Sequence, residues 1–300
     1  MAAKEPAVLC ESSREGITTI TINRPHVRNA VNHAAAVELA EAFRAFENDS
    51  SQKVCVLAGA GDTFCAGYDL HEVAALSGLP REQAKRHASP ASPVDRVNGA
   101  PGPMGPSRMS LSKPIIAAVS GHAVAGGLEL ALLADMRVAD STAVFGVFCR
   151  RFGVPLIDGG TVRLQKIVGL GRAMDMILTG RPVCADEALA MGLVNRVVAG
   201  KGEAVREAKR LAGVLLRFPE RCMRADLASA HYSAYDAKGL EDALRFEFER
   251  GHEVILDESL AGAKRFDGGA GRGGKFDHET HDGRAHGGDH DAKSTGKSRL

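Results

Sequence analysis

Two glycine-bearing segments, each following an apolar run of strand character, most constrain the fold of this chain. Residues 53–58 (KVCVLA) precede the first segment, residues 64–69 (FCAGYD), and residues 114–119 (PIIAAV) precede the second, residues 121–129 (GHAVAGGLE). The second segment continues into a Leu- and Ala-rich stretch that favours a helix. A strand, a glycine turn and a helix N-terminus leave backbone N–H groups without partners, and such groups can bind an anionic oxygen.

The order of the other elements predicts an α/β chain. Residues 16–22 alternate and are β-branched, which is typical of a strand, and Asn32 can cap a helix that follows it. The order strand, helix, strand then recurs, as in α/β folds. Amphipathic helices are expected at residues 204–216 and 240–251. Residues 88–106 are rich in Pro, Gly, Ser and Ala, so we expect a loop there, either a wall of a binding pocket or a tolerated surface insertion.

Several motifs in a fixed order carry a family resemblance. They are residues 23–25 (NRP), 29–30 (NA), 64–69, 113–117 (KPIIA), 126–131 (GGLELA), 145–146 (FG), 159–161 (GGT), 178–180 (LTG) and 192–194 (GLV). From residue 17 to 263 the chain resembles the crotonase, or enoyl-CoA hydratase/isomerase, superfamily. The resemblance implies a spiral of stacked ββα units at residues 1–200 and a C-terminal helical trimerisation or lid region at 201–266. It also implies a homotrimer or a dimer of trimers.

The resemblance implies that the substrate is an acyl-CoA thioester. Its carbonyl oxygen would accept hydrogen bonds from the backbone N–H groups of Tyr68 and Gly126, an oxyanion hole. Coenzyme A would be part of the substrate, and no separate cofactor is expected. The residues carried over to substrate and CoA binding are Arg24, Arg28, Ala66, Asp69, Gly127 and Cys149.

Adding water to a conjugated double bond requires a base and a proton source, which two carboxylates can supply. Glu129 lies three residues after Gly126, one helical turn away and among apolar neighbours, so we expect it in the same cavity. The second glutamate that is usual in the family's hydratases falls at Cys149. Asp158 matches a catalytic aspartate of relatives that isomerise dienoyl-CoA. An Asx turn or a cap on the following helix is the alternative role for Asp158.

Three functions remain open at this point. The leading hypothesis is an enoyl-CoA hydratase, a lyase of the fatty-acid β-oxidation type that adds water syn to a 2-enoyl-CoA with Glu129 and Asp158. The first alternative is an enoyl- or dienoyl-CoA isomerase, which needs the same oxyanion hole and no bound water. The second is a CoA-thioester binding protein that lost catalysis together with the glutamate at Cys149.

The composition and the tail restrict partners and location. The net charge of +1 argues against nucleic-acid or membrane binding, and the six dispersed cysteines favour a reduced intracellular protein. Residues 267–300 have the composition of a disordered tail, and its histidines do not predict a metal site. The tail ends in Ser298-Arg299-Leu300, a variant of the peroxisomal tripeptide that an import receptor reads. We expect a peroxisomal protein, with the cytoplasm as the alternative.

Overall fold

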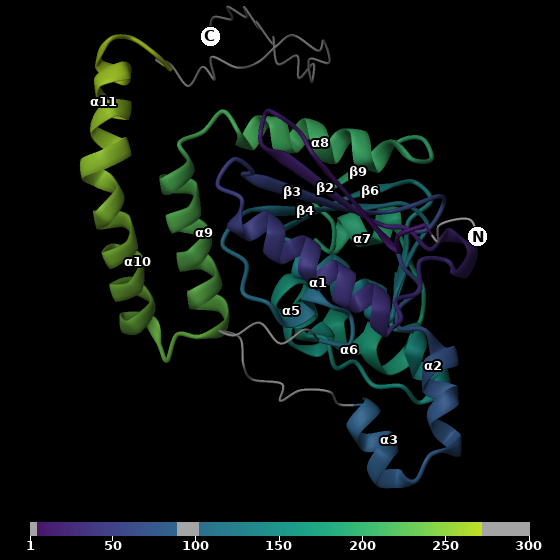
Figure 1. The fold of residues 1–300 in the computed structure, drawn as a ribbon. Coiled ribbons are helices and arrows are strands. Elements are labelled where there is room, and N and C mark those ends of the chain that lie inside the picture. The colour runs from purple at the N-terminus through teal and green to yellow at the C-terminus, as the bar shows by residue number, and fades with distance from the viewer. Residues whose placement is uncertain (1–4, 89–101, 272–300) are drawn as a thin grey trace, which may run out of the picture.

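The computed structural model describes residues 5–88 and 102–271 of the chain. Within them, a six-stranded sheet has the strand order β1-β2-β3-β4-β6-β9 (Figure 1). Its strands are β1 (Val8–Ser12), β2 (Ile17–Ile22), β3 (Val54–Gly59), β4 (Ile115–Val119), β6 (Met136–Asp140) and β9 (Arg196–Val198). β1 is antiparallel to β2, and the other neighbouring pairs are parallel. β3 and β4 are buried almost throughout, as parallel strands covered on both faces usually are.

A smaller sheet carries the second glycine segment. In the described residues it consists of β5 (His122–Val124), β7 (Val144–Gly146) and β8 (Val183–Cys184). β5 is parallel to β7, which is antiparallel to β8. The strand predicted before this segment is β4, in the large sheet. β5, which was not predicted, begins three residues after β4 ends, and only Ala125 separates β5 from α4 (Gly126–Leu133).

Helices cover both faces of the large sheet (Figure 1). On one face, α8 (Glu203–Leu215) packs Ala208 and Leu211 against the outward side chains of β3 and β4. On the other face, α1 (His33–Asn48) contributes Leu39 and Phe43 to the main core. The predicted cap of α1 is confirmed, because the Asn32 side chain accepts a hydrogen bond from the backbone N–H of Ala35. Alternate residues of each strand therefore face one or the other layer of helices.

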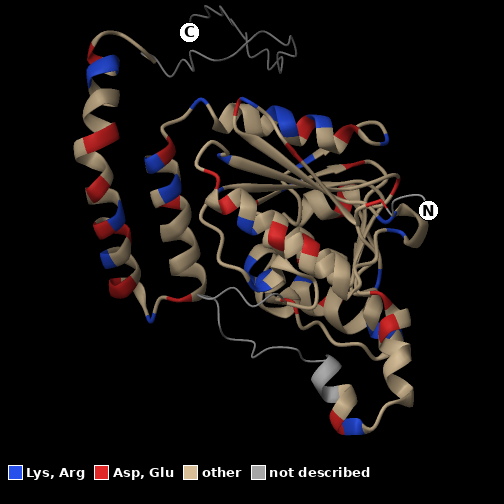
Figure 2. Cartoon of the chain, in the orientation of Figure 1, with Lys and Arg blue, Asp and Glu red and all other residues tan. Residues whose placement is uncertain are grey.

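The remaining helices surround the smaller sheet or extend from the core. They are α2 (Leu70–Ala75), α3 (Arg81–Ala88), α5 (Gly160–Val168), α6 (Leu170–Thr179), α7 (Ala185–Ala190), α9 (Glu220–Tyr235), α10 (Leu240–Val254) and α11 (Leu260–Asp267). Short helical turns are η1 (Pro25–Val27), η2 (Leu76–Gly78), η3 (Pro106–Arg108), η4 (Phe148–Phe152) and η5 (Ile255–Ser259). α9, α10 and α11 stand beside the core, with α11 continuing the direction of α10 (Figure 1). Along α10 and α11 basic and acidic residues are interspersed (Figure 2).

The α/β architecture and the C-terminal helical region are as predicted. α8 begins one residue before the expected helix and lies on the sheet, so the part that projects from the core begins with α9. The predicted loop at residues 88–106 is described only at its two ends, and most of the tail, with the terminal tripeptide, lies outside the described residues. No helix in residues 5–88 and 102–271 combines the length and apolarity that a bilayer-spanning helix needs.

Candidate active site

The two glycine segments lie side by side and are joined by backbone hydrogen bonds. Cys65 N–H donates to His122 O at 2.8 Å, and Val124 N–H donates to Cys65 O at 3.1 Å. Gly127 allows this close approach, because a Cβ built there would lie 2.0 Å from the Cys65 carbonyl oxygen. Gly67 has a φ of +104°, and a Cβ built on it would lie 3.1 Å from the Gly126 nitrogen. The end of the first segment is therefore held against the N-terminus of α4.

This contact leaves two N–H groups available at one place. Among the described residues, neither the Tyr68 N–H nor the Gly126 N–H makes a backbone hydrogen bond, although Asp69 N–H donates to Val31 O at 2.8 Å. Gly126 is the first residue of α4, where an N–H has no intrahelical partner. Ala125 just before it has a φ of +53°, a strained conformation for a residue with a Cβ. Two such donors can stabilise a carbonyl oxygen that gains negative charge.

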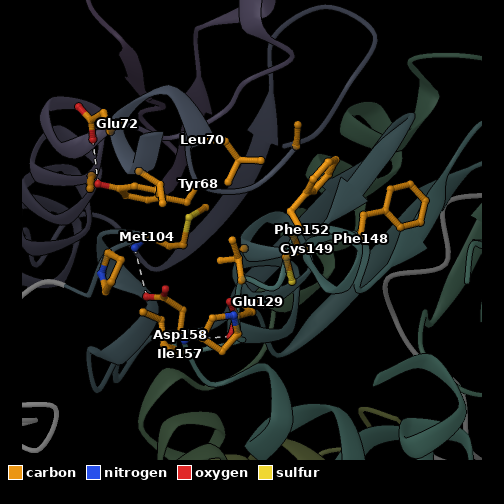
Figure 3. A pocket seen from close by; sticks show the side chains of 18 of the residues that line it. Tyr68, Leu70, Glu72, Met104, Glu129, Phe148, Cys149, Phe152, Ile157 and Asp158 are labelled. Atoms are coloured by element: carbon orange, nitrogen blue, oxygen red, sulfur yellow. Dashed lines mark hydrogen bonds between the residues drawn. The ribbon is translucent and has the colours of Figure 1, made fainter. Parts of the chain in front are cut away.

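Tyr68 and Gly126 both line a cavity of about 1130 Å³. Its walls come from α1, α2, α4, η4 and residues 102–104. Large apolar side chains dominate the lining, among them Leu70, Met104, Phe148, Phe152 and Ile157 (Figure 3). The cavity thus combines a mainly apolar interior with a few polar groups, the usual form of a small-molecule site.

Glu129 reaches this cavity from the first turn of α4 and is only 2% exposed. Its Oε1 accepts hydrogen bonds from the backbone N–H groups of Asp158 at 2.9 Å and Gly160 at 2.8 Å. Gly160 is necessary for this approach, since a Cβ there would lie 2.9 Å from Oε1. Burial, followed by the charge of Asp158, raises the pKa of Glu129 to about 7. This carboxyl group can therefore take up or release a proton near neutral pH.

Asp158 lies beside Glu129 and is also 2% exposed (Figure 3). Its Oδ1 accepts hydrogen bonds from Met104 N–H at 3.1 Å and from the hydroxyl of Ser107. The residue that caps α5 is Gly159, and no side chain makes a capping hydrogen bond there, so Asp158 is not a helix cap. Burial raises the pKa of Asp158, while the hydrogen bond from Ser107 opposes the rise. Two buried carboxylates thus face one cavity.

Cys149 lies on η4, across from Asp158, with its thiol near Glu129 (Figure 3). It is 8% exposed and lines the cavity. Burial, and then the charge of Glu129, raises the pKa of the Cys149 thiol. The thiol is therefore protonated near neutral pH and does not provide a negative charge where the usual hydratase glutamate would stand.

The structure divides the residues predicted to bind the substrate into two groups. Arg28 and Ala66 line the cavity together with Cys149. Arg24, Asp69 and Gly127 are not among the lining residues. The Arg24 guanidinium donates to Ala30 O and to Asp69 Oδ2, the latter at 3.3 Å. Asp69 caps α2 by accepting from His71 N–H at 3.2 Å. Arg24 thus pairs with the last residue of the first glycine segment, and Gly127 lies against the Cys65 carbonyl of the same segment, so these residues support the segment without lining the cavity.

Other lining residues were not predicted from the sequence. Met104, from the Gly- and Pro-rich segment, covers Gly126, where a Cβ would lie 2.6 Å from the Met104 sulfur. The guanidinium of Arg151 lies 4.7 Å from the centroid of the Phe148 ring and 5.5 Å from that of the Phe152 ring. The sequence left two roles open for the loop at residues 88–106, and residues 102–104 line the cavity, which agrees with the role of a pocket wall. Phe148 and Phe152 carry no motif that would have identified them.

Comparison with known proteins gives consistent results. A family model described as enoyl-CoA hydratase/isomerase matches residues 12–259. The chain is 34% identical to a protein of Arabidopsis thaliana named probable enoyl-CoA hydratase 1, peroxisomal, over 83% of both chains. It is 38% identical to a mevalonyl-coenzyme A hydratase of Beauveria bassiana over 66% of this chain and 69% of that protein. A crystal structure of an enoyl-CoA hydratase from Mycobacterium marinum superposes with a TM-score of 0.75 and 32% identity, covering 88% of this chain and 96% of the other.

The packing around Asp158 predicts the effect of Gly102→Ala. A Cβ at residue 102 would lie 2.3 Å from the Ser107 hydroxyl oxygen and 2.5 Å from Asp158 Oδ1. These side chains are buried and hydrogen-bonded to each other, so they cannot yield without losing contacts. We expect Gly102→Ala to lower the free energy of unfolding by about 1–3 kcal/mol, measured by denaturant titration.

Gly78→Ala is the matched control, because a Cβ at residue 78 meets no atom within 4 Å. It should change the free energy of unfolding by less than about 0.5 kcal/mol. Equal stability of the two variants would show that the contact between residue 102 and the Asp158 carboxylate is loose.

Proposed function

Because this chain belongs to the enoyl-CoA hydratase/isomerase family, we propose that it is a lyase that adds water to the double bond of a 2-enoyl-CoA thioester. One observation carries the proposal: two buried carboxylates and two available backbone N–H groups face the same cavity. The carboxylates belong to Glu129 and Asp158, and the N–H groups to Tyr68 and Gly126. Relatives named for crotonyl and mevalonyl groups share the family, so membership alone does not determine the acyl group.

The thioester carbonyl oxygen accepts hydrogen bonds from Tyr68 N–H and Gly126 N–H. As water adds to the β carbon, negative charge develops on this oxygen as an enolate. The two donors are held by the strand and helix around them, so they need no reorganisation when the charge appears. Loss of one such donor typically costs on the order of 3 kcal/mol of transition-state stabilisation.

The water lies between the two carboxylates. Its oxygen bonds to the β carbon while one O–H bond breaks and the released proton passes to Glu129, which returns a proton to the α carbon on the same face. Glu129 suits the transfer of this proton, because its pKa is about 7. Asp158 suits the orientation of the water, because Met104 and Ser107 hold its carboxylate in place. Water is the co-substrate and CoA is part of the substrate, so the reaction requires no further cofactor.

The ultraviolet absorbance of a conjugated enoyl thioester tests the proposal. Hydration removes this absorbance, isomerisation shifts it, and binding alone leaves it intact. The assay separates the hydratase from an enoyl- or dienoyl-CoA isomerase and from a non-catalytic binding protein. It should be run over several acyl chain lengths with the full chain.

The first prediction from the proposed function concerns the two carboxylates. We expect Glu129→Gln to lower kcat by about 10²–10⁴-fold while CoA-thioester binding persists. Asp158→Asn should lower kcat by a similar factor. The double variant should lose far less than the product of the two factors, because residues that act on one water act as a unit. The measurement is the steady-state loss of enoyl absorbance, with binding followed by calorimetry.

Glu41→Gln, on the exposed face of α1, is the control and should keep wild-type kinetics. An Asp158→Asn variant that folds and stays fully active would remove Asp158 from the reaction. A large loss in Cys149→Ser would instead assign the second role to the thiol.

The second prediction concerns pH. If the ionised form of Glu129 accepts the proton of water, kcat/KM falls tenfold per pH unit below about pH 7. In the Asp158→Asn variant, this fall in kcat/KM should begin at a lower pH, because the charge of Asp158 raises the pKa of Glu129. The pKa of Glu129 in this variant should stay above the usual range of a glutamate, since burial is the larger cause of its rise. A flat profile between pH 5 and 8 would contradict the role of Glu129.

We also propose that the chain forms a homotrimer or a dimer of trimers. Large apolar side chains are exposed along α10 and α11, where Leu244 is 53% and Phe248 is 69% exposed. Exposed apolar surface of this kind is typical of an interface.

The peroxisomal location stays a prediction, because its tripeptide lies outside the described residues. The Arabidopsis relative is named as a peroxisomal protein, which favours this location.

The third prediction tests the assembly. Sedimentation of the full chain should give a mass of three or six chains. Phe248→Asp should shift the distribution toward single chains, because it places a charge in an apolar contact. Glu249→Ala, an exposed neighbour, should leave the mass unchanged. A wild-type protein that sediments as one chain would end this proposal.

A further inference from the structure

One polar pair stands out in the mainly apolar part of the cavity. The hydroxyl of Tyr68 donates to Glu72 Oε2 at 2.8 Å, and both residues line the cavity (Figure 3). Glu72 lies in the first turn of α2, and its Oε2 also accepts from His33 N–H, at the beginning of α1, at 2.9 Å. Both helices therefore hold this carboxylate in position. The reaction proposed above makes no use of either side chain.

The position of the pair relates it to the acyl group rather than to the nucleotide of CoA. The arginines that line the cavity are Arg28 and Arg151, and phosphates require such cations. Arg151 lies with the Phe148 and Phe152 rings, on the other side of the cavity from Glu72 (Figure 3). A carboxylate is a poor neighbour for phosphates. The Glu72 side, enclosed by α1, α2 and residues 102–104, therefore suits the acyl chain.

The hydrogen-bond inventory then determines which acyl group fits. A phenol has one proton to donate and can also accept, whereas a carboxylate only accepts. The proton of Tyr68 is directed to Glu72, and burial, with the hydrogen bond to Glu72, raises the pKa of this phenol. No hydrogen bond of Glu72 Oε1 to a described residue is formed. The hydrogen-bonding positions that the pair still offers to the cavity are therefore acceptors. A ligand group that donates a hydrogen bond satisfies them, whereas a group that only accepts does not.

We infer that the Tyr68–Glu72 pair recognises a hydroxyl group on the acyl chain, so that the preferred substrates are hydroxylated 2-enoyl-CoA thioesters. This inference rests on the proposed acyl-CoA site. A hydroxyl donates to the phenol oxygen or to Glu72, whereas an unsubstituted chain leaves these polar groups facing a methyl group. A terminal carboxylate meets the like charge of Glu72, has no proton to donate to the pair, and is rejected. Such a site is selective because a ligand without the matching group leaves the polar groups of the site unpaired.

Matched ligands test the inference. Dissociation constants are measured by calorimetry for saturated five- and six-carbon acyl-CoA thioesters with a terminal methyl, hydroxyl or carboxylate group. The kcat/KM values of the corresponding 2-enoyl compounds are measured in parallel. At one of the two lengths, the hydroxylated ligand should bind at least about tenfold more tightly than its unsubstituted partner, and the carboxylate more weakly than either. Equal or weaker binding of the hydroxylated ligand at both lengths overturns the inference.

Variants then assign the preference to the pair. In Tyr68→Phe and in Glu72→Gln, the ratio of hydroxylated to unsubstituted affinity should fall toward one. Glu47→Gln is the control, because Glu47 also lies on a helix and accepts backbone N–H groups, those of Ser112 and Lys113, but does not line the cavity. It should keep the wild-type ratio. A ratio unchanged in both cavity variants also overturns the inference.

The two sets of measurements separate this inference from the proposed function. Binding of the saturated thioesters does not depend on turnover, so a binding preference without hydration supports the pair and refutes the hydratase. Hydration of both 2-enoyl compounds with equal kcat/KM and equal affinity refutes the pair and leaves the hydratase intact.

Discussion

The close backbone contact between the two glycine segments is the constraint on which the site depends. Gly127 lies against the Cys65 carbonyl with no room for a Cβ, and this contact sets where α4 begins. The beginning of α4 places the Gly126 N–H beside that of Tyr68, and one turn later it directs Glu129 into the same cavity. One contact between main chains therefore positions both the oxyanion donors and the first carboxylate. Side chains could change around it with little effect on this geometry.

A second set of contacts, made by the Glu129 and Asp158 carboxylates, positions the other walls of the cavity relative to α4. The Glu129 carboxylate holds the backbone at residues 158 and 160, which determines where the Asp158 side chain points. Asp158 in turn holds Met104 N–H and the Ser107 hydroxyl, so the segment before α5 and the segment around η3 meet at one carboxylate. Hydrogen bonds from N–H and O–H groups offset part of the free energy that burial of two negative charges costs. The remainder appears as the raised pKa values of both groups.

The sequence allowed the parts of the site that depend on local patterns to be predicted. The glycine segments, the cap at Asn32 and Glu129 follow from spacing within single strands and helices, and the structure places them accordingly. The partners of Asp158 could not be predicted, because Ser107 is 51 residues away in the sequence and the short turn η3 that carries it has no periodic pattern. Arg24 and Asp69 show the converse case. They belong to conspicuous motifs, yet they pair with each other and do not line the cavity, since a motif does not reveal which way its side chains point.

The thiol at residue 149 and the carboxylate at residue 158 are best understood together. Glu129 already has a raised pKa because of burial and of the charge of Asp158. A third carboxylate at residue 149, beside Glu129, would raise it further and would keep one of the three groups protonated. A neutral thiol fills the same space and leaves the charge of the site to the other two. Cys149 is thus compatible with a working pair of carboxylates as long as Asp158 supplies the second one. The absence of the usual glutamate is therefore no argument against catalysis in this chain.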